Sequence, residues 1–267
     1  WVKCVTEANL TLPELVDVAI DMRAVCDLPI ILDAGGGWGD PVHMDRTVNL
    51  CQAAGFAAIE IEDQVLPRRV HHHIGREYLI EPEQMVLKIR EAVAARSDPS
   101  MLIIGRTNAQ RVHGIEDAVR RGEMYREAGA DMIFVHTRTP EEMRFIGERL
   151  GAPLMIFAPQ DGFANFPMTK SELAGLGFRL ACSSGSAFAN STNSNPSVPA
   201  AFSSVIFDFV WSCGKGPISA SPSRFFLFGL NLPHPAYGMC AFMAGFRQFP
   251  AAYLQNCRLR RIISAYA

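Results

Sequence analysis

Short apolar runs alternate with longer amphipathic stretches between residues 28 and 184, and this repetition is the strongest constraint on the fold. The apolar runs occupy residues 30–32, 57–61, 101–105, 132–135, 154–158 and 179–182. The amphipathic stretches occupy residues 42–54, 81–96, 114–128, 140–150 and 169–177. Strands of about five residues that alternate with helices of about ten to fifteen predict βαβ units and a parallel sheet.

Residues at the ends of the expected helices agree with this pattern. Pro82 and Pro140 stand near the first turn of two of them, where proline is well tolerated. Thr11 is the expected N-cap of a further helix over 12–26, and residues 2–5 are an expected strand before it.

The expected strands number one fewer than the eight of a closed (β/α)8 barrel. The first βα unit is therefore expected to be missing or to precede Trp1. An open doubly wound sheet is the alternative, but a long repetition without a reversal favours the barrel. We predict an α/β protein with a (β/α)8 TIM barrel over residues 1–188.

Composition excludes several classes of protein. A formal net charge of −2 leaves no basic surface typical of nucleic-acid binding and no polybasic membrane patch. The seven cysteines form no CxxC pair, so neither a zinc knuckle nor a disulfide framework is indicated. Reduced thiols and no visible signal peptide predict a cytoplasmic protein.

Residues 189–267 differ in character from the preceding part of the chain. Charged side chains become rare, Phe, Ser and Pro become frequent, and helical periodicity is poor. The prolines at 233 and 235 argue against a bilayer span. Three interpretations remain open: an apolar extension that packs on a partner subunit, a weak membrane-associating tail, or non-native sequence from a shifted reading frame.

The stretch PIILDAGGGWGDP at 29–41 places an acid, Asp33, at the end of an apolar run and a glycine-rich turn after it. A dinucleotide loop is excluded, because GxGxxG read from Gly35 requires glycine where Asp40 stands. A P-loop is excluded because no GK[ST] follows. A carboxylate at the C-terminal end of a strand indicates a metal or substrate ligand in an α/β enzyme.

The block IEIEDQ at 59–64 would place Glu60 and Glu62 on one side of a strand. Unpaired buried charges cost several kcal/mol, so a cation facing Glu62 and Asp33 would stabilise them. Arg106, in LIIGRTN, could bind a substrate carboxylate in a bidentate manner. Mg²⁺ fits best, because it takes few protein oxygens.

A structural role for these acids remains equally open. They could form salt bridges with Arg68, Arg69 and Arg106 that close the mouth of the barrel. The histidines at 71–73 predict a polar loop over the site, because three consecutive side chains cannot point the same way. His136 ends an expected strand and could be an acid, a base or a substrate donor.

These segments resemble the isocitrate lyase/phosphoenolpyruvate mutase superfamily from about residue 10 to residue 188. DAGGGWGDP at 33–41 resembles the family's DADxGYGNP, and IEIEDQVLPRR at 59–69 resembles its IHIEDQxxPKR. IIGRTNA at 103–109 resembles IIARTDA, and AGADMIFVH at 128–136 matches the AGAD segment. Members are (β/α)8 barrels, usually tetrameric, that use Mg²⁺ to stabilise an enolate-like 2-oxo acid.

The resemblance implies a role for each matching position. Asp33 and Glu62 would serve the Mg²⁺ site, directly or through water. Substrate contacts are expected at Gly36, Gly37, Arg69 and Arg106. Arg106 is also an expected catalytic residue, and His72 or His136 would supply a proton.

Four positions depart from the family pattern. Gly35 replaces the second acid of DAD, Val70 replaces the lyase cysteine, His136 replaces a glutamate and Phe157 replaces an asparagine. The KxNS loop of the mutases is also absent, so isocitrate cleavage and the mutase reaction are disfavoured. The resemblance then implies an oxaloacetate decarboxylase-like or 2-alkylmalate lyase-like enzyme. The alternatives are an inactive barrel or gene fragment, and P–C bond chemistry on a phosphonate.

Overall fold

The computed structural model describes residues 10–24, 27–66, 77–137, 139–158, 166–183 and 226–228. Its strands form one parallel sheet in the order β6-β5-β4-β3-β2-β1-β7. The strands are β1 (Ile30–Asp33), β2 (Ala58–Glu62), β3 (Leu102–Thr107), β4 (Met132–Val135), β5 (Leu154–Ala158), β6 (Phe178–Ser183) and β7 (Phe226–Phe228). The helices are α1 (Leu12–Arg23), η2 (Pro41–His43), α2 (Met44–Ala53), α3 (Pro82–Ala95), α4 (Ala109–Val112), α5 (Ile115–Glu127), α6 (Pro140–Leu150) and α7 (Lys170–Gly175).

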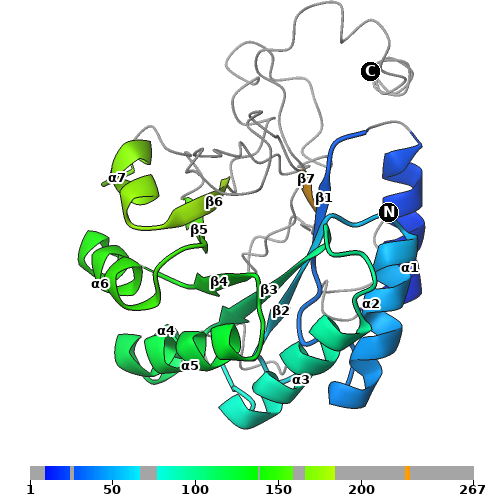
Figure 1. Ribbon diagram of the computed structural model, residues 1–267, viewed down its shortest axis with the longest axis horizontal. Helices are drawn as coiled ribbons and strands as arrows, with labels where there is room; N and C mark the ends of the chain where they lie inside the picture. The colour runs from blue at the N-terminus through cyan, green and yellow to red at the C-terminus, as the bar shows by residue number, and fades with distance from the viewer. Residues whose placement is uncertain are drawn as a thin grey trace, which may run out of the picture.

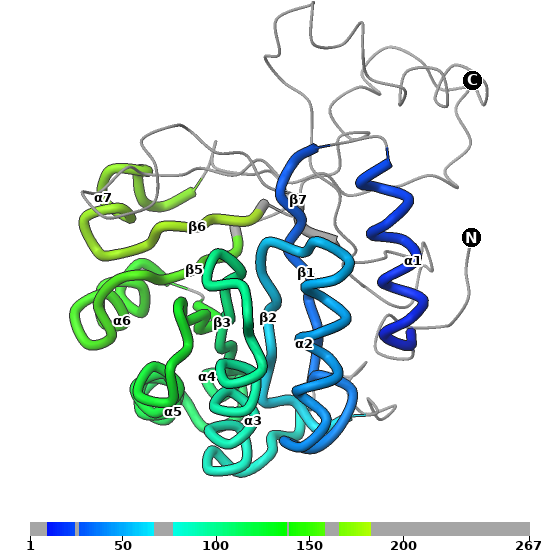
Figure 2. Tube along the Cα trace, turned by 45° about the vertical axis from the view of Figure 1, so that its right-hand side comes forward, coloured from blue at the N-terminus to red at the C-terminus, as the bar shows by residue number. Residues whose placement is uncertain are grey.

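The sheet is curved, and the helices lie along its convex side (Figure 1). The same arrangement is seen after a rotation of 45° (Figure 2). A doubly wound sheet needs helices on both faces, so the barrel prediction is the correct one. Each of the six apolar runs expected between 28 and 184 overlaps a strand from β1 to β6. Among the described strands none pairs with both β6 and β7, so the described part is an open portion of a barrel.

Local sequence signals fix where several helices begin. Thr11 is the N-cap of α1, as expected, and its backbone N–H donates to Glu14 Oε2 at 2.8 Å. Pro82 and Pro140 are the first residues of α3 and α6, so both proline predictions are confirmed. The strand expected at 2–5 lies outside the described residues.

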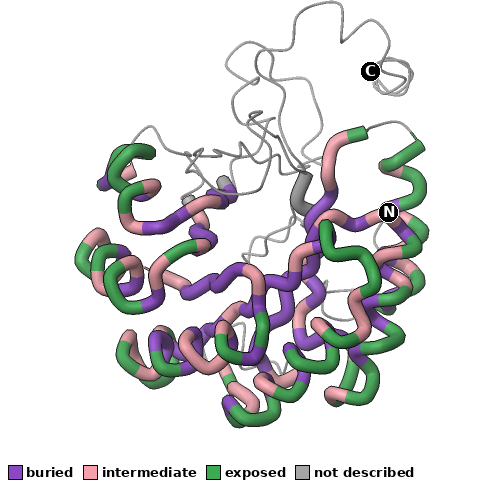
Figure 3. Tube along the Cα trace, in the orientation of Figure 1, coloured by how far each residue is buried: buried purple, intermediate pink, exposed green. Residues whose placement is uncertain are grey.

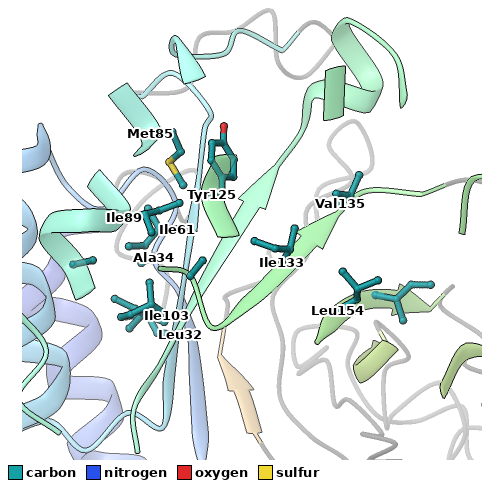
Figure 4. Packing of buried hydrophobic residues seen from close by; sticks show 14 of the residues in the cluster. Leu32, Ala34, Ile61, Met85, Ile89, Ile103, Tyr125, Ile133, Val135 and Leu154 are labelled. Atoms are coloured by element: carbon teal, nitrogen blue, oxygen red, sulfur yellow. The ribbon is translucent and has the colours of Figure 1, made fainter. Parts of the chain in front are cut away.

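The outer core lies between the strands and the helices. Figure 4 shows Leu32, Ile61 and Ile103 of three neighbouring strands close to Met85 and Ile89 of α3. Each fully buried aliphatic side chain of this kind contributes roughly 2 kcal/mol relative to exposure. Burial is concentrated along the strands and on the inward sides of the helices (Figure 3).

The inner face of the sheet carries a second, smaller cluster. Its buried members are Ile31, Ala58, Ile104, Met132, Phe134, Met155, Leu180 and Cys182. Because side chains alternate along a strand, Ile31 points inward while Ile30 and Leu32 belong to the outer core. Two residues after Ile31 on β1 and two residues after Ile104 on β3, the inner face reaches the C-terminal edge of the sheet.

Strand β7 comes from the segment that the sequence sets apart from the barrel. Its backbone pairs in parallel with β1, and Leu227 is the partner of Ile31. The expected boundary at residue 188 lies outside the described residues, so the division into 1–188 and 189–267 stays a prediction. Within the described ranges, no helix combines the length and the apolar character that crossing a bilayer requires.

Candidate active site

Four charged side chains continue the inner face at the C-terminal edge of the sheet. Asp33 follows Ile31 by two residues, Glu60 and Glu62 follow Ala58, and Arg106 follows Ile104, so all four share the inward direction. The strand register pairs Asp33 with Glu60 and Glu62 with Arg106. The structure therefore brings Asp33, Glu62 and Arg106 together, as expected from neighbouring strand ends, and the acids form the ion pairs with Arg106 that the structural alternative expected.

Arg106 is the centre of this group. Its Nη1 lies 2.7 Å from Glu60 Oε1 and 3.6 Å from Asp33 Oδ2. Its Nε lies 3.3 Å from Glu62 Oε2. Asn108 closes the arrangement, because its Nδ2 donates to Glu62 Oε2 at 2.8 Å and its Oδ1 accepts from Arg106 Nε at 3.3 Å.

The group has more negative than positive charge in a nearly dry position. Glu60 and Glu62 are each 1% exposed, whereas the side chains of Arg106 and Asp33 are 11% and 21% exposed. Burial raises the pKa of Glu60 to about 8, against the attraction of Arg106 and with a further increase from Asp33 and Glu62. Burial lowers the pKa of Arg106, but the three carboxylates raise it more, so the guanidinium stays charged.

The carboxylates of Asp33, Glu60 and Glu62 fit a divalent cation whose remaining ligands would be water or substrate oxygens. Glu60 Oε2 is buried and accepts no hydrogen bond from any described residue. No set of three or more His, Cys, Asp or Glu side chains in the described ranges could hold a metal ion by itself. Mg²⁺ is commonly bound by one or two carboxylates plus water and substrate oxygens, and Asp33 with Glu62 provides such a pair.

Two phenylalanines form an aromatic wall beside Arg106. The rings of Phe134 and Phe157 meet edge to face, with centroids 4.7 Å apart. The Arg106 Cζ lies 4.9 Å from the Phe134 centroid and 5.8 Å from the Phe157 centroid. A cation–π contact of this kind stabilises the guanidinium and restricts its orientation. Phe157 thus has a defined packing role where the resemblance leads one to expect asparagine.

The glycine loop after β1 passes beside the carboxylates. Gly35 N–H donates to Asp33 Oδ1 at 2.9 Å, and Glu62 N–H donates to the Gly35 carbonyl at 2.8 Å. Gly37 has φ +77°, and a Cβ there would lie 2.6 Å from Met44 Cε. Gly36 and Gly37, which were expected to contact substrate, therefore lie on the loop that orients Asp33.

Asp63 also belongs to the acidic block, but it faces the outer core. It accepts hydrogen bonds from Thr107 Oγ1 at 2.6 Å, Asn108 N at 3.0 Å and Tyr125 Oη at 2.7 Å. Arg121 Nη1 lies 3.2 Å from its Oδ2. Burial raises the pKa of Asp63, while these donors and Arg121 lower it. This carboxylate joins β2 to β3 and α5 and is a structural group.

His136 lies at the rim of the site. Its Nε2 is 2.5 Å from Arg111 Nη2, and Arg111 Nη1 is 2.5 Å from Glu77 Oε1. A guanidinium can only donate, so Nε2 is the acceptor in this contact. The ring centroid of His136 is 6.4 Å from that of Phe157, which connects the rim to the aromatic wall.

The segment that contains Arg69, Val70 and His72 lies outside the described residues. The described residues on either side of it are joined to each other, because Val65 N–H donates to the Tyr78 carbonyl at 2.8 Å and Ile80 N–H donates to the Asp63 carbonyl at 2.9 Å. The expected roles of Arg69 and His72 therefore stay predictions.

Lys88 of α3 is a polar residue of this region that the sequence did not identify. It is 8% exposed, and its Nζ donates to the Gly36 carbonyl at 2.7 Å. The available signal was its helical position, since Lys88 shares a face with the apolar Met85 and Ala92. A lysine on such a face indicates a specific buried acceptor.

The model of a family described as phosphoenolpyruvate phosphomutase matches residues 4–195. A 2,3-dimethylmalate lyase of Eubacterium barkeri is 38% identical over 173 residues, which are 64% of this chain and 59% of the relative. A 2-methylisocitrate lyase of Aeropyrum pernix is 46% identical over 147 residues, 55% and 47% of the two chains. An oxaloacetate decarboxylase of Paraburkholderia xenovorans is 36% identical over 148 residues, 55% and 49% of the two chains. The chain thus spans about half the length of these relatives.

Solved structures show the same likeness. A crystal structure of 2,3-dimethylmalate lyase, described as a PEP mutase/isocitrate lyase superfamily member, has a TM-score of 0.57 and 31% identity, with 65% of this chain and 60% of that chain covered. A phosphonopyruvate hydrolase in complex with oxalate and Mg²⁺ has a TM-score of 0.54 and 31% identity, with 63% and 58% covered.

Proposed function

Because this chain belongs to the phosphoenolpyruvate phosphomutase family, within the isocitrate lyase/PEP mutase superfamily, we propose that it is a Mg²⁺-dependent carbon–carbon lyase for a small 2-oxo or 2-hydroxy dicarboxylate. The observation that carries the proposal is the convergence of Asp33, Glu60 and Glu62 on Arg106. The names of three relatives support the reaction class, since they are two lyases and a decarboxylase.

Asp33 and Glu62 are the proposed residues of the cation site. Asp33 is held by the Gly35 N–H and Glu62 by Asn108, so both carboxylates are oriented before any ligand arrives. Bound Mg²⁺ would supply electron withdrawal from the substrate oxygen next to the breaking bond.

Arg106 is the proposed anchor for a substrate carboxylate. Its planar guanidinium can bind a carboxylate through two parallel hydrogen bonds, and the aromatic wall of Phe134 and Phe157 fixes its plane. A substrate carboxylate would compete with Glu60 for Nη1, because the two now lie 2.7 Å apart. The aromatic wall also excludes water from one side of the guanidinium.

Cleavage leaves an electron pair on the substrate that must receive a proton. In decarboxylation of a 2-oxo diacid, the carbon–carbon bond breaks, CO₂ leaves, and the resulting enolate takes one proton at carbon. His72 and His136 are the proposed donors. For His136 the Nε2 must first be released by Arg111 and take up a proton from solvent, because that nitrogen accepts a hydrogen bond in the structure.

Turnover of oxaloacetate and of 2-alkylmalates tests the proposal through release of pyruvate or of a longer 2-oxo acid. Activity is expected to disappear with EDTA and to return with excess Mg²⁺. Asp33→Asn is expected to lower Mg²⁺ affinity, measured calorimetrically, whereas Asp17→Asn on the exposed side of α1 serves as the matched control. Absence of turnover of every such substrate by folded, Mg²⁺-loaded protein would refute the lyase.

The alternatives give different results in the same assays. Turnover of phosphonopyruvate would favour P–C bond chemistry. This alternative is included because the chain is similar to a phosphonopyruvate hydrolase. An inactive barrel would be favoured if wild-type protein binds Mg²⁺ no more tightly than Asp33→Asn does and turns over none of these substrates. A homo-oligomer, as the resemblance implies, belongs to the proposal and is tested by light scattering.

A further inference from the structure

Lys88 reaches the glycine loop from α3, a helix on the convex side of the sheet. It comes from α3 and is 8% exposed, and its Nζ donates to the Gly36 carbonyl at 2.7 Å. Burial lowers the pKa of this lysine, which Asp40 partly opposes. A buried ammonium is unfavourable for folding, and an apolar side chain of similar length would fill the same space at lower cost. Packing alone therefore does not explain this residue.

The contact of Lys88 determines the direction of one peptide plane. The carbonyl of Gly36 and the N–H of Gly37 point in opposite directions, because the peptide bond is planar and trans. Lys88 binds the carbonyl, and the N–H donates to the Ala34 carbonyl at 2.8 Å. The plane between Gly36 and Gly37 is thus held at both ends.

The neighbouring peptide groups connect this plane to both proposed cation ligands. Gly35 N–H donates to Asp33 Oδ1 at 2.9 Å, and Glu62 N–H donates to the Gly35 carbonyl at 2.8 Å. A rotation of the Gly36 peptide would move Gly35, and Gly35 contacts Asp33 and Glu62 directly. The glycines allow such a rotation readily, since they lack a Cβ.

We propose that Lys88 is a positioning residue, which fixes the glycine loop through the Gly36 carbonyl and thereby orients the Asp33 carboxylate for its ligand. Lys88 itself touches neither the carboxylates nor Arg106 in the contacts described above. The link to catalysis rests on the proposed function, because it requires Asp33 to serve the cation site. The link to the loop rests on the structure alone.

Lys88→Met tests this role, because methionine keeps most of the volume and removes the donor. Amide hydrogen exchange over residues 34–40 is expected to become about 10-fold faster, since the loop loses a contact that holds it closed. The Mg²⁺ dissociation constant is expected to rise about 10-fold, as for other residues that orient a ligand. In turnover, kcat is expected to fall while KM changes less. Lys170→Met, at an exposed position of α7, is the matched control and is expected to leave all three quantities unchanged.

Thermal unfolding followed by circular dichroism shows whether the variant is folded. Lys88→Gln, which is shorter and uncharged, is measured in the same way if Lys88→Met does not fold, with the same changes expected. Unchanged exchange in residues 34–40 would overturn the proposal, and so would faster exchange with wild-type Mg²⁺ affinity and kcat. Wild-type protein that binds no Mg²⁺ would refute the proposed function, and the exchange rates would then decide alone whether Lys88 fixes the loop.

Discussion

Arg106 Nη1 and Glu60 Oε1 lie 2.7 Å apart and join the C-terminal ends of two neighbouring strands. The pair leaves the other oxygen of Glu60 buried without a hydrogen bond from any described residue. One guanidinium serves three carboxylates here, so the group as a whole favours an additional proton or cation. This excess of negative charge should affect both the stability of the protein and the proposed binding of a cation.

Glu60→Gln is expected to change how stability depends on pH in metal-free protein. The pKa of Glu60 is raised from 4.5 to about 8, so the folded state holds this proton more tightly than the unfolded chain. The free energy of unfolding should therefore fall as pH rises from 4.5 to about 8. Glutamine removes this contribution, which amounts to a few kcal/mol at about 1.4 kcal/mol per pKa unit.

Urea unfolding at pH 5, 6.5 and 8 in EDTA measures the effect of Glu60→Gln. Glu91→Gln, at an exposed position of α3, controls for the loss of a carboxylate. Parallel pH profiles for wild-type protein and Glu60→Gln would contradict the prediction.

Arg106→Lys is expected to lower kcat/KM by about 100-fold, equal to about 2.7 kcal/mol of transition-state stabilisation. Lysine keeps the charge but loses the planar pair of donors and the stacking on Phe134. Steady-state kinetics with the best substrate measures this change. Arg90→Lys, on the exposed side of α3, is the control, and equal kcat/KM values for the two variants would exclude a substrate-binding role for Arg106.

Asp63→Asn is expected to destabilise the fold by about 2–4 kcal/mol, because an amide nitrogen cannot accept the hydrogen bonds of Thr107 and Tyr125 and because Arg121 keeps only Asp117 as a counter-charge. Asp63 and Arg121 are 0% and 4% exposed. Chemical unfolding measures the loss, with the exposed Asp21→Asn as the control. A loss below about 1 kcal/mol, the usual range for exposed ion pairs, would show that the network contributes little.

Gly37→Ala is expected to destabilise the protein by about 2–4 kcal/mol, from backbone strain and the close approach of Met44, and Gly151→Ala by about 1–3 kcal/mol, from backbone strain alone. Both glycines have positive φ, +77° and +64°, and Gly151 with ψ −176° lies in a region that is essentially restricted to glycine. An added Cβ would meet nothing within 4 Å at Gly151, but at Gly37 it would lie 2.6 Å from Met44 Cε. The difference between the two variants in thermal unfolding therefore measures the close approach to Met44. Equal losses would mean that Met44 moves away freely.

The strands and the inward direction of the acids could be predicted because both follow from period-two alternation. Ile59 and Ile61 lie in the outer core and Glu60 and Glu62 on the inner face, as the pattern of IEIE indicates. The position of Arg106 beside them followed from the order of consecutive parallel strands. The period-two pattern on neighbouring strands was therefore sufficient to predict which side chains lie at the centre of the candidate site.

Contacts between elements that are distant in sequence could not be predicted in the same way. A helical pattern places Lys88 on a buried face but does not show that the Gly36 carbonyl lies opposite. Asp63 follows Glu62 directly, yet its partners on α5 decide that it is structural. The contact of His136 with Arg111 likewise depends on how α4 meets the end of β4.

The alternation along β2 has an evolutionary consequence. The acids of one short segment face opposite sides of the sheet: Glu60 and Glu62 pair with Arg106 in the candidate site, and Asp63 pairs with Arg121 of α5. Insertion or deletion of a single codon before Ile61 would reverse the faces of the residues that follow. Ile61 would then point into the candidate site and Glu62 into the outer core. The loops around the sheet can therefore vary in length, but the segment from Ala58 to Asp63 tolerates substitutions and not insertions or deletions.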